Sequence, residues 1–355
     1  MQATTLTQLT NSLKTEQHFA GEDKYWKEYF PNLVKISNDF SEGAREFFKK
    51  QKFYVCNPSI LVGVLGACEN FDTVYKIKKV EQGYQFLSQT AQLQLERALS
   101  FDIKKIACFT KSFRNEVNIS DGRHLREFTL IELELAKLEL SELLDSIELC
   151  IKSMISNGIF KNEDVINKQF GVSIKKQEKR FLTSKYQRIT YTEAIKLLQQ
   201  KGENLQWGDD LSSSSEGKLL ELMGYKPFFI THFPEHIKFF NMRLNRANPK
   251  VVNSADLILP VSGEAVGSAE REFNFSILKE RFFKSSMFEK MKKIGITEQD
   301  LGCYFKIVEK REIPEHAGCG IGFERVLQSV LSPYPTDIRL FSQPYIMNRT
   351  LGIFV

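Results

Sequence analysis

Arg114 and Phe128 are residues whose types and spacing suit the binding of a ligand that is both charged and aromatic. Arg114 lies near the end of the strand-like stretch "IKKIACFTKSFRNE", and Phe128 stands in the alternating stretch "REFTLIELELA" after the polar loop "VNISDGRH". A hairpin would bring both side chains and Glu116 together. A guanidinium fork matches phosphate oxygens, and a phenyl ring offers a stacking face to a nucleobase. An ordinary hairpin with a surface arginine and a core phenylalanine would explain the same residues.

Three alternating glycines precede a second arginine near the end of the chain, in "GCGIGFERVL". Gly318, Gly320 and Gly322 allow the backbone to approach a ligand closely, and Arg325 follows where an apolar run begins a helix. A guanidinium plane there would cover one face of an aromatic ring while Phe128 meets the other. The spacing is not that of the dinucleotide-binding fingerprint. Tight packing is the other use of such glycines.

Two carboxylates, Asp256 and Glu264, stand eight residues apart in "ADLILPVSGEAVG", with a proline and a glycine between them. Carboxylate oxygens bind hard cations such as Mg²⁺, which commonly arrive with phosphates. Arg271, seven residues later, suits the polar end of a substrate. Each of these residues alone fits a solvated surface charge equally well. In combination, two arginines, a stacking ring and two acids predict an ATP site.

The elements that must position these residues are mostly strands, and few of them are separated by a single helix. This pattern predicts an α+β protein with a mainly antiparallel sheet flanked by helices. Residues 211–217, "LSSSSEG", fit either a linker or a helix start capped by Ser215. The helix over 140–155 should bury Leu149 on its apolar side. We expect further helices over 39–52, 91–101, 190–202 and 323–331, and strands over 53–61, 83–88, 103–116, 126–136, 227–234, 254–267 and 303–308.

The composition argues against several classes of protein. The chain contains no apolar run of about 18 residues, and its polar N-terminus lacks an apolar signal core, so we expect a cytoplasmic protein without a membrane span. The six cysteines form no CxxC pair and the five histidines are scattered, which argues against a zinc site and a disulfide framework. A net charge of +5 is too small to indicate nucleic-acid binding by itself.

The stretch "FRNEVNISDGRHLREFTLIELELA" resembles motif 2 of the class II aminoacyl-tRNA synthetases, and "GCGIGFERVL" resembles motif 3. The stretch "REFFKKQKFYVCNPSIL" is similar to motif 1, in which the proline, here Pro58, lies at a dimer interface. Within the class, "FLSQTAQLQLE", "PFFITHFPEHIKFFNMRLN" and "PEHAGCGIGFER" are most similar to the asparaginyl type. The resemblance covers roughly residues 36–345 and implies the class II synthetase fold, ATP, Mg²⁺ and a homodimer.

The resemblance assigns the nucleotide site by position. Arg114 resembles the motif 2 arginine that holds the α-phosphate, and Phe128 and Arg325 resemble the two faces of the adenine sandwich. Glu116 would lie near the adenine or the ATP, and His124 resembles the histidine that reaches the terminal phosphate. Arg114 and Arg325 are therefore the expected catalytic residues, because activation needs positioning and charge stabilisation but no general base.

The resemblance also assigns the amino-acid site. Gln92 and Glu132 resemble the pair that reads the α-amino group, and Glu69 resembles a glutamate on a mobile loop over the amino acid. Arg271 resembles the arginine that reads the side-chain carbonyl. Leu95 stands where aspartyl enzymes carry a lysine, which favours asparagine over aspartate.

The sequence departs from the family pattern in three places. Only about 35 residues precede the catalytic region, too few for a five-stranded anticodon-binding barrel. We therefore expect a helical extension over residues 1–35, a catalytic domain over 36–355 and no anticodon-binding domain. The family's "GGSQRE" is "GSAERE" here, beside Arg271, and its C-terminal "FPR" is "FSQ". The first of these changes puts the amino-acid specificity in question.

The activity implied by the resemblance is the ATP-dependent activation of asparagine or aspartate as an aminoacyl-adenylate, with release of pyrophosphate. Asp256 and Glu264 resemble the Mg²⁺ carboxylates of that reaction. The acyl group would pass to an acceptor that is not selected by anticodon reading, such as ammonia, a biosynthetic amine or carrier, or the acceptor end of a tRNA. The alternative is a non-catalytic synthetase-like protein that binds an amino acid or RNA in a regulatory role.

Overall fold

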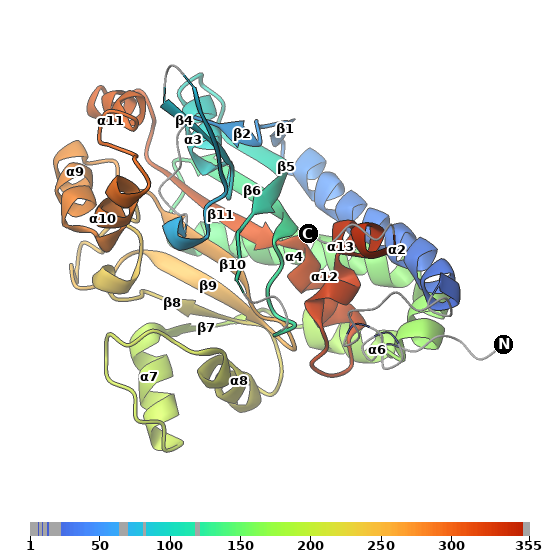
Figure 1. Cartoon of the computed structure of the whole chain (residues 1–355). Helices are drawn as coiled ribbons and strands as arrows, with labels where there is room; N and C mark the ends of the chain where they lie inside the picture. Colours follow the sequence, from blue (N-terminus) through green and yellow to red (C-terminus); the bar gives the residue numbers. More distant parts are fainter. Residues whose placement is uncertain are drawn as a thin grey trace.

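A computed structural model describes residues 23–63, 70–80, 83–117 and 121–350, together with Leu6, Leu9 and Leu13. Its strands are β1 (Tyr54–Cys56), β2 (Leu61–Val62), β3 (Lys76–Val80), β4 (Gly83–Leu87), β5 (Lys105–Phe113), β6 (Glu127–Ala136), β7 (Gln187–Thr190), β8 (Phe228–Thr231), β9 (Ser254–Leu259), β10 (Gly263–Glu270) and β11 (His316–Gly322). Eight of them form one sheet in the order β1-β5-β6-β11-β10-β9-β8-β7, and β2-β4-β3 form a smaller one (Figure 1).

The large sheet is mainly antiparallel, as the sequence predicts. Only its outermost pairs, β1 with β5 and β7 with β8, are parallel within the described residues. At its centre β6 pairs with β11, which lies far along the chain, and the register sets Glu132 opposite Gly320 and Glu134 opposite Gly318. The long central strands therefore carry motif 2 and motif 3 side by side.

The helices lie on both sides of this sheet. They are α2 (Asp23–Lys50), α3 (Gln92–Leu99), α4 (Leu140–Lys161), α5 (Glu163–Val165), α6 (Ile174–Gln177), α7 (Tyr191–Gln200), α8 (Ser213–Leu222), α9 (Phe275–Lys284), α10 (Ser286–Lys293), α11 (Gly302–Glu309), α12 (Phe323–Leu331) and α13 (Gln343–Thr350). Short helical turns are η1 (Phe71–Thr73), η2 (Ile166–Phe170), η3 (Glu178–Leu182), η4 (Glu235–Ile237) and η5 (Ile338–Phe341). None of the described helices has the length and apolar character needed to cross a membrane.

Side chains of the central strands alternate between a core face and an open face. Odd-numbered residues of β6, such as Ile131 and Leu133, are packed in the main core, which α4 covers and on which α2 lies in turn (Figure 1). Even-numbered residues, such as Glu132 and Glu134, face the opposite side and line a cavity. The alternation therefore places polar groups of motif 2 on one face.

Several local expectations differ from the structure. Residues 303–308 belong to helix α11 rather than to a strand, and the side chains of Tyr304, Phe305 and Val308 are buried on one helical face. Ser212, not Ser215, caps α8, because its side chain accepts the backbone N–H of Ser215. Leu149 is 53% exposed, since α4 turns that side to solvent.

The first described helix, α2, joins two stretches that the sequence predicts to be helical separately. It runs from Asp23 to Lys50, so the helix expected over 39–52 is continuous with the last part of the helical extension expected over 1–35. Its buried residues, among them Tyr29, Leu33 and Ile36, join the same core as α4. Trp26, Tyr29 and Leu33 thus pack in the main core although they precede residue 36.

Candidate active site

A cavity of about 420 Å³ opens on the face of the sheet that carries the motif 2 carboxylates. Most of the residues predicted for the site line it: Gln92, Arg114, Phe128, Glu132, Asp256, Glu264, Arg271 and Arg325. A pocket of about 60 Å³ adjoins it and is lined by Glu116 and His124 together with Arg114, Phe128 and Arg325. Glu69 lies outside the described residues. The structure thus brings together residues that are up to 233 positions apart in the sequence.

The nucleotide end of the cavity is formed by the β5–β6 hairpin and the start of α12. The backbone N–H of Arg114 donates to the carbonyl of Arg126 at 2.9 Å, and the Arg114 guanidinium carbon lies 5.3 Å from the centre of the Phe128 ring. Arg325 lies in the first turn of α12 and donates to the carbonyl of Glu264. Two guanidinium groups and a phenyl face are what a nucleoside phosphate requires.

Asp121 shapes the loop between the two hairpin strands. Its Oδ1 accepts the backbone N–H groups of Arg123 at 2.9 Å and His124 at 3.2 Å, and its Oδ2 lies 2.5 Å from His124 Nδ1. Glu116 contributes its carbonyl to Arg126 Nε at 3.1 Å. These contacts hold His124 at the small pocket, and the Asp121 carboxylate fixes the orientation of its imidazole ring.

The glycines of β11 serve two different purposes. A Cβ at Gly318 would lie closer than 3.0 Å to the Glu134 carboxylate, whereas one at Gly320 would meet nothing closer than Glu132 at 3.8 Å. Gly320 and Gly322 line the cavity, but Gly318 does not. The expectation that all three admit a ligand is therefore too broad, because Gly318 makes room for a buried carboxylate on the neighbouring strand.

Gln92 and Glu132 lie together at the other end of the cavity. Glu132 accepts the backbone N–H of Ala91 at 2.6 Å and the hydroxyl of Thr90, while burial raises the pKa of Glu132 to about 7. Gln92 Nε2 donates to Glu96 at 2.5 Å, and the buried Gln92 Oε1 has no hydrogen-bond partner within the described residues. The Glu132 carboxylate and the Gln92 amide oxygen are both hydrogen-bond acceptors, so together they can bind an ammonium group.

A network of buried charged side chains holds the Arg271 guanidinium in place at the cavity. Its Nη2 and Nε donate to Glu134 Oε1 at 2.6 and 3.2 Å, and Glu96 Oε1 lies 4.0 Å away. His316 Nε2 lies 3.3 Å from Glu96 Oε2 and 4.0 Å from Glu134 Oε2. Burial raises the pKa of Glu134, while His316 and Arg271 outweigh burial at Glu96 and hold its pKa below the ordinary value.

Sequence reasoning missed the three other residues of this network, which are Glu134, Glu96 and His316. Glu134 follows Glu132 by two residues, so strand alternation alone would have placed both on the cavity face. Glu96 lies one helical turn after Gln92, which puts the two side chains on one face of α3. His316 carried no such signal, because its position depends on the pairing of β11 with β6.

Asp256 and Glu264 were predicted to bind Mg²⁺, and their geometry fits a small cation. A Cβ at Gly267 would lie 3.6 Å from Glu264 Oε1 and 4.0 Å from Asp256 Oδ1, so both oxygens face one small space. Burial raises the pKa of Asp256 to about 7, and the neighbouring charges of Glu264 and Glu216 add to the rise. An added cation would relieve this excess of negative charge.

Lys238 is a residue of this site that the sequence analysis did not identify. Its Nζ lies 2.6 Å from Asp256 Oδ2 and 3.9 Å from the centre of the Phe233 ring. The ammonium is largely buried and lines the same cavity as Arg271 and Glu264. Lys238 would therefore compete with any metal ion for one oxygen of Asp256.

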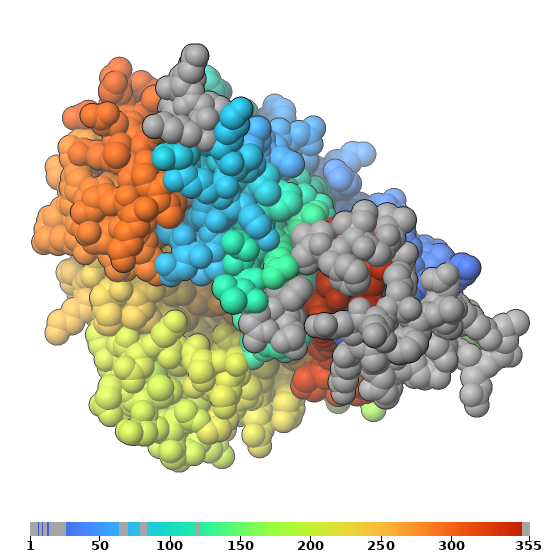
Figure 2. All heavy atoms as spheres, viewed as in Figure 1, coloured from blue at the N-terminus to red at the C-terminus, as the bar shows by residue number. Residues whose placement is uncertain are grey.

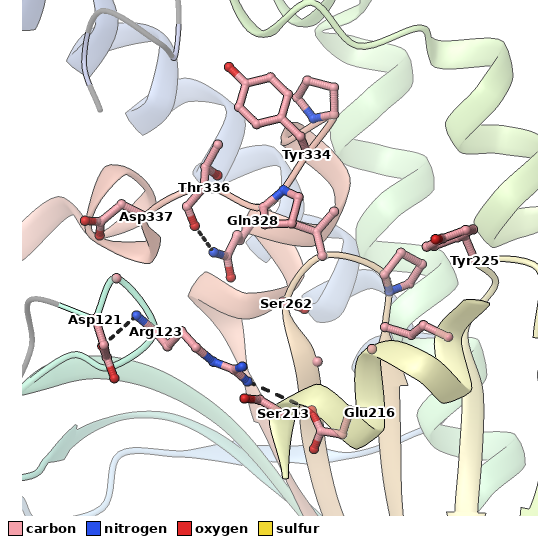
Figure 3. Close-up of a pocket in the computed structure, with 18 of the residues that line it drawn as sticks. Asp121, Arg123, Ser213, Glu216, Tyr225, Ser262, Gln328, Tyr334, Thr336 and Asp337 are labelled. Atoms are coloured by element: carbon pink, nitrogen blue, oxygen red, sulfur yellow. Dashed lines mark hydrogen bonds and ion pairs between the residues drawn. The ribbon is translucent and has the colours of Figure 1, made fainter. Parts of the chain in front are cut away.

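A second cavity, of about 640 Å³, lies beside the first one (Figure 3). Glu216 lines both, and its carboxylate accepts the backbone N–H of Glu264 at 3.3 Å and lies 4.0 Å from Arg123 Nη2. Burial, with a contribution from Glu264, raises the pKa of Glu216 to about 7. Figure 3 shows Arg123 reaching from the motif 2 loop toward this carboxylate.

The "GSAERE" stretch affects the cavity less than the sequence suggests. Glu270 accepts the backbone N–H of Leu140 at 2.8 Å and Asn253 Nδ2 at 2.9 Å, and it does not line the cavity. Ser268 does line it, but its hydroxyl donates to the carbonyl of Ala255 at 2.7 Å. Two of the altered side chains thus bind neighbouring strands and α4.

Comparison with known proteins agrees with this arrangement. The family model described as "tRNA synthetases class II (D, K and N)" matches residues 24–339. The asparagine–tRNA ligase of Thermococcus kodakarensis is 32% identical over 300 residues, which cover 84% of this chain and 65% of that protein. The asparagine–tRNA ligase of Pyrococcus horikoshii is 33% identical over 302 residues, with the same coverage. The chain thus spans about 65% of the length of these relatives.

The fold comparison gives the same result. The crystal structure of asparaginyl-tRNA synthetase from Pyrococcus horikoshii complexed with asparaginyl-adenylate has a TM-score of 0.78 and 30% sequence identity, and the match covers 90% of this chain and 69% of that chain. The predicted α+β fold and the resemblance to asparaginyl-type enzymes are therefore confirmed. With its matched motifs on β6, β11 and α12, this chain belongs to the family of class II tRNA synthetases (D, K and N).

Proposed function

We propose that this chain activates asparagine or aspartate with ATP to form an aminoacyl-adenylate and release pyrophosphate. The observation that carries the proposal is a single cavity in which Arg114, Phe128 and Arg325 meet two carboxylates and Arg271. The P. horikoshii relative of similar fold binds asparaginyl-adenylate. A nucleotide end and an amino-acid end in one cavity suit the joining of these two substrates.

The chemistry requires positioning more than proton transfer. A carboxylate oxygen of the amino acid forms a bond to the α-phosphorus as the bond to the bridging oxygen breaks and pyrophosphate leaves. Arg114 would hold the α-phosphate and offset its developing charge, while Phe128 and Arg325 would enclose the adenine. Asp256 and Glu264 would hold Mg²⁺, which when bound neutralises phosphate charge. Gln92 and Glu132 would bind the α-ammonium group, and Arg271 the side-chain carbonyl.

The test is ATP–pyrophosphate exchange with purified protein and each amino acid in turn, followed by the same assay with Arg114→Ala. We expect exchange with asparagine or aspartate and its loss in the variant. Arg246→Ala, at an exposed loop position, is the control and should exchange normally. Exchange that survives in Arg114→Ala would remove the role assigned to this arginine, and no exchange with any amino acid would refute the proposal.

The acyl acceptor and the oligomeric state belong to the same proposal. The acceptor is identified by adding tRNA, ammonia or amines to the loaded protein and following the labelled amino acid. A homodimer through motif 1 is supported by exposed apolar side chains around Pro58: Tyr54 is 68%, Val55 44%, Ile60 43% and Leu61 44% exposed. Such a patch on the edge of a sheet is the kind of surface that a second copy covers.

A further inference from the structure

The second cavity, of about 640 Å³, adjoins the part of the candidate active site that was assigned to phosphates and metal. Glu216 lines both this cavity and the first one, and Arg123 lines both this cavity and the small pocket at His124. Figure 3 shows Arg123 and Glu216 at one end of the second cavity and Tyr334 at the opposite end. Its volume lies within the usual range for pockets that hold a ligand, about 300–1,000 Å³.

Three parts of the chain that are distant in sequence form the walls of the second cavity. They are the motif 2 loop at 121–123, helix α8, and residues 333–337 after α12. In Figure 2 the turquoise motif 2 hairpin lies between the yellow-green α7–α8 segment and the red segment near the C-terminus. The backbone N–H of Ile338 donates to the carbonyl of Gly122 at 2.8 Å, so two of these walls are joined directly.

Most of the charged side chains that line the second cavity already have partners of opposite charge. Arg339 Nε donates to both carboxylate oxygens of Asp337 at 3.0 Å. Asp121 accepts the hydrogen bonds of the motif 2 loop, and Arg123 Nη2 lies 4.0 Å from the Glu216 carboxylate. These groups therefore leave little net charge at their end of the cavity.

Arg180, on η3, is the lining cation that lacks such a partner. No hydrogen bond or ion pair joins its side chain to another residue within the described part of the chain. Burial lowers the pKa of Arg180, and no neighbouring carboxylate counteracts this effect. A guanidinium that is half-buried without an anion has lost hydration and gained nothing in return, so an anionic ligand would stabilise it.

The segment around Arg180 adds further positive charge outside the cavity. Residues 166–182 carry a single carboxylate, Glu178, and five basic side chains: Lys168, Lys175, Lys176, Lys179 and Arg180. The four lysines are exposed, and none of them forms an ion pair with a residue that the structure describes. Such an excess of cations raises the local concentration of small anions near the cavity.

We propose that the second cavity is a holding site for pyrophosphate that has left the active site, with Arg180 as its anchor. The inference rests on the proposed function, because pyrophosphate is the product of that reaction. Asp256 and Glu264 would repel a free pyrophosphate, whereas Arg123 and Arg180 would attract it. Guanidinium groups also match phosphate oxygens in geometry.

Other anions fit these features less well. The adenine of a nucleotide already has an assigned place between Phe128 and Arg325, in the first cavity. An RNA backbone would match the exposed lysines, but it would not reach a guanidinium that is half-buried in a cavity. A free amino acid could pair its carboxylate with Arg180, but it carries fewer negative charges than pyrophosphate and would gain less from the basic segment.

The site is tested first by binding alone, which does not require activity. Labelled pyrophosphate is dialysed to equilibrium against the protein without added metal. The variant Arg114→Ala/Arg325→Ala removes two cations of the active site and should still bind one pyrophosphate. Adding Arg180→Met should weaken this binding about tenfold or more, the loss expected for a hydrogen bond to a charged group. Adding Arg246→Met, at an exposed loop position, should leave it unchanged.

Gly217→Phe provides a second variant that blocks the cavity without removing a charge. Gly217 lines the second cavity, and a Cβ there would meet nothing within 4 Å. Gly217 lies within α8, where glycine is the poorer helix former, so the variant should fold. Its ring should lower the affinity for pyrophosphate as Arg180→Met does.

The transit role is tested by ATP–pyrophosphate exchange, in which pyrophosphate must enter by the path through which it leaves. In Arg180→Met and Gly217→Phe, kcat/KM for pyrophosphate should fall about fivefold, whereas KM for ATP should stay within twofold of wild type. Lys175→Glu/Lys176→Glu should lower the same ratio in dilute salt but not at about 1 M salt, where the Debye length is about 3 Å. Lys292→Glu/Lys293→Glu, an exposed pair on α10, should have no effect.

Two results would overturn the inference. One is pyrophosphate binding that survives both Arg180→Met and Gly217→Phe, or that is already absent in Arg114→Ala/Arg325→Ala. The other is an equal fall of kcat/KM for ATP and for pyrophosphate. Exchange that persists in the wild type beside either result would show that only this inference failed. Exchange that is absent with every amino acid would instead refute the proposed function, and the dialysis experiment would still decide whether the anion site exists.

Discussion

Gly318 lies so close to the Glu134 carboxylate that adding one methyl group, in Gly318→Ala, should disturb the active site. In Gly318→Ala the new Cβ would lie closer to the Glu134 carboxylate than real Cβ atoms come, so the carboxylate must leave its place. Gly318 does not have a positive φ, so this contact alone would strain the variant. The displaced Glu134 would lose its hydrogen bonds to Arg271, and a buried carboxylate and guanidinium would be separated.

The cost follows from the burial of this pair. Breaking a buried ion pair destabilises a protein by about 3–5 kcal/mol. With an unfolding entropy of about 2.1 cal/mol/K per residue, this corresponds to a Tm lower by about 4–7 °C for a chain of this length. The KM for the amino acid should also rise, because Arg271 would no longer be held at the cavity. Scanning calorimetry and pyrophosphate exchange measure the two effects.

Gly320→Ala is the matched control on the same strand. Its Cβ would meet Glu132 at an ordinary 3.8 Å, so the Tm should stay near that of the wild type. Because Gly320 lines the cavity, only substrate binding should change. Equal Tm values for the two variants would refute the argument that Gly318 exists to accommodate Glu134.

Three further predictions concern protons, metal and assembly. Burial raises the pKa of Glu324 from 4.5 to about 7. Between these two pH values the carboxyl group keeps its proton in the folded chain and loses it in the unfolded chain. The free energy of unfolding therefore falls as pH rises through this range. Glu324→Gln should remove about 3 kcal/mol of that fall, measured by urea unfolding at pH 5 and 8; an unchanged pH profile would argue against it. Lys238→Met should tighten Mn²⁺ binding severalfold at pH 8, because the metal no longer competes with an ammonium for Asp256; unchanged affinity in a titration would mean that Asp256 is not a ligand. Val55→Asp should convert a dimer to a monomer in light scattering at micromolar concentration, whereas Leu149→Asp, which is also at an exposed apolar position, should not.

The hairpin part of the site was predictable because its geometry is local. Phe128 lies on β6, and Arg114 directly follows β5, the strand that pairs with β6 and is joined to it by one loop. Strand alternation and the loop therefore suffice to bring the two residues together. The error at residues 303–308 was also local. Aromatic and β-branched residues suggested a strand, but Tyr304, Phe305 and Val308 follow the helical period.

The charge network could not be derived in this way. Arg271 and Glu134 are 137 residues apart in the sequence. The sequence pattern around either residue does not indicate that β10 and β6 both pair with β11. Lys238 reaches Asp256 from an irregular segment whose path depends on the packing around it. Long-range pairing of buried charges is a property of the assembled sheet, so only the structure reveals it.

The pairing of β6 with β11 has a consequence for how the chain matures. During synthesis β6 leaves the ribosome about 180 residues before β11, the strand that lies between β6 and β10 in the sheet. The motif 2 carboxylates on β6 therefore have no neighbouring β11 until most of the chain has been made. Contacts of such sequence separation slow folding, and until they form, the open edge of β6 is exposed to other chains. Nascent chains halted before residue 316 should therefore depend on chaperones, and the active site should appear only in the last stage of folding.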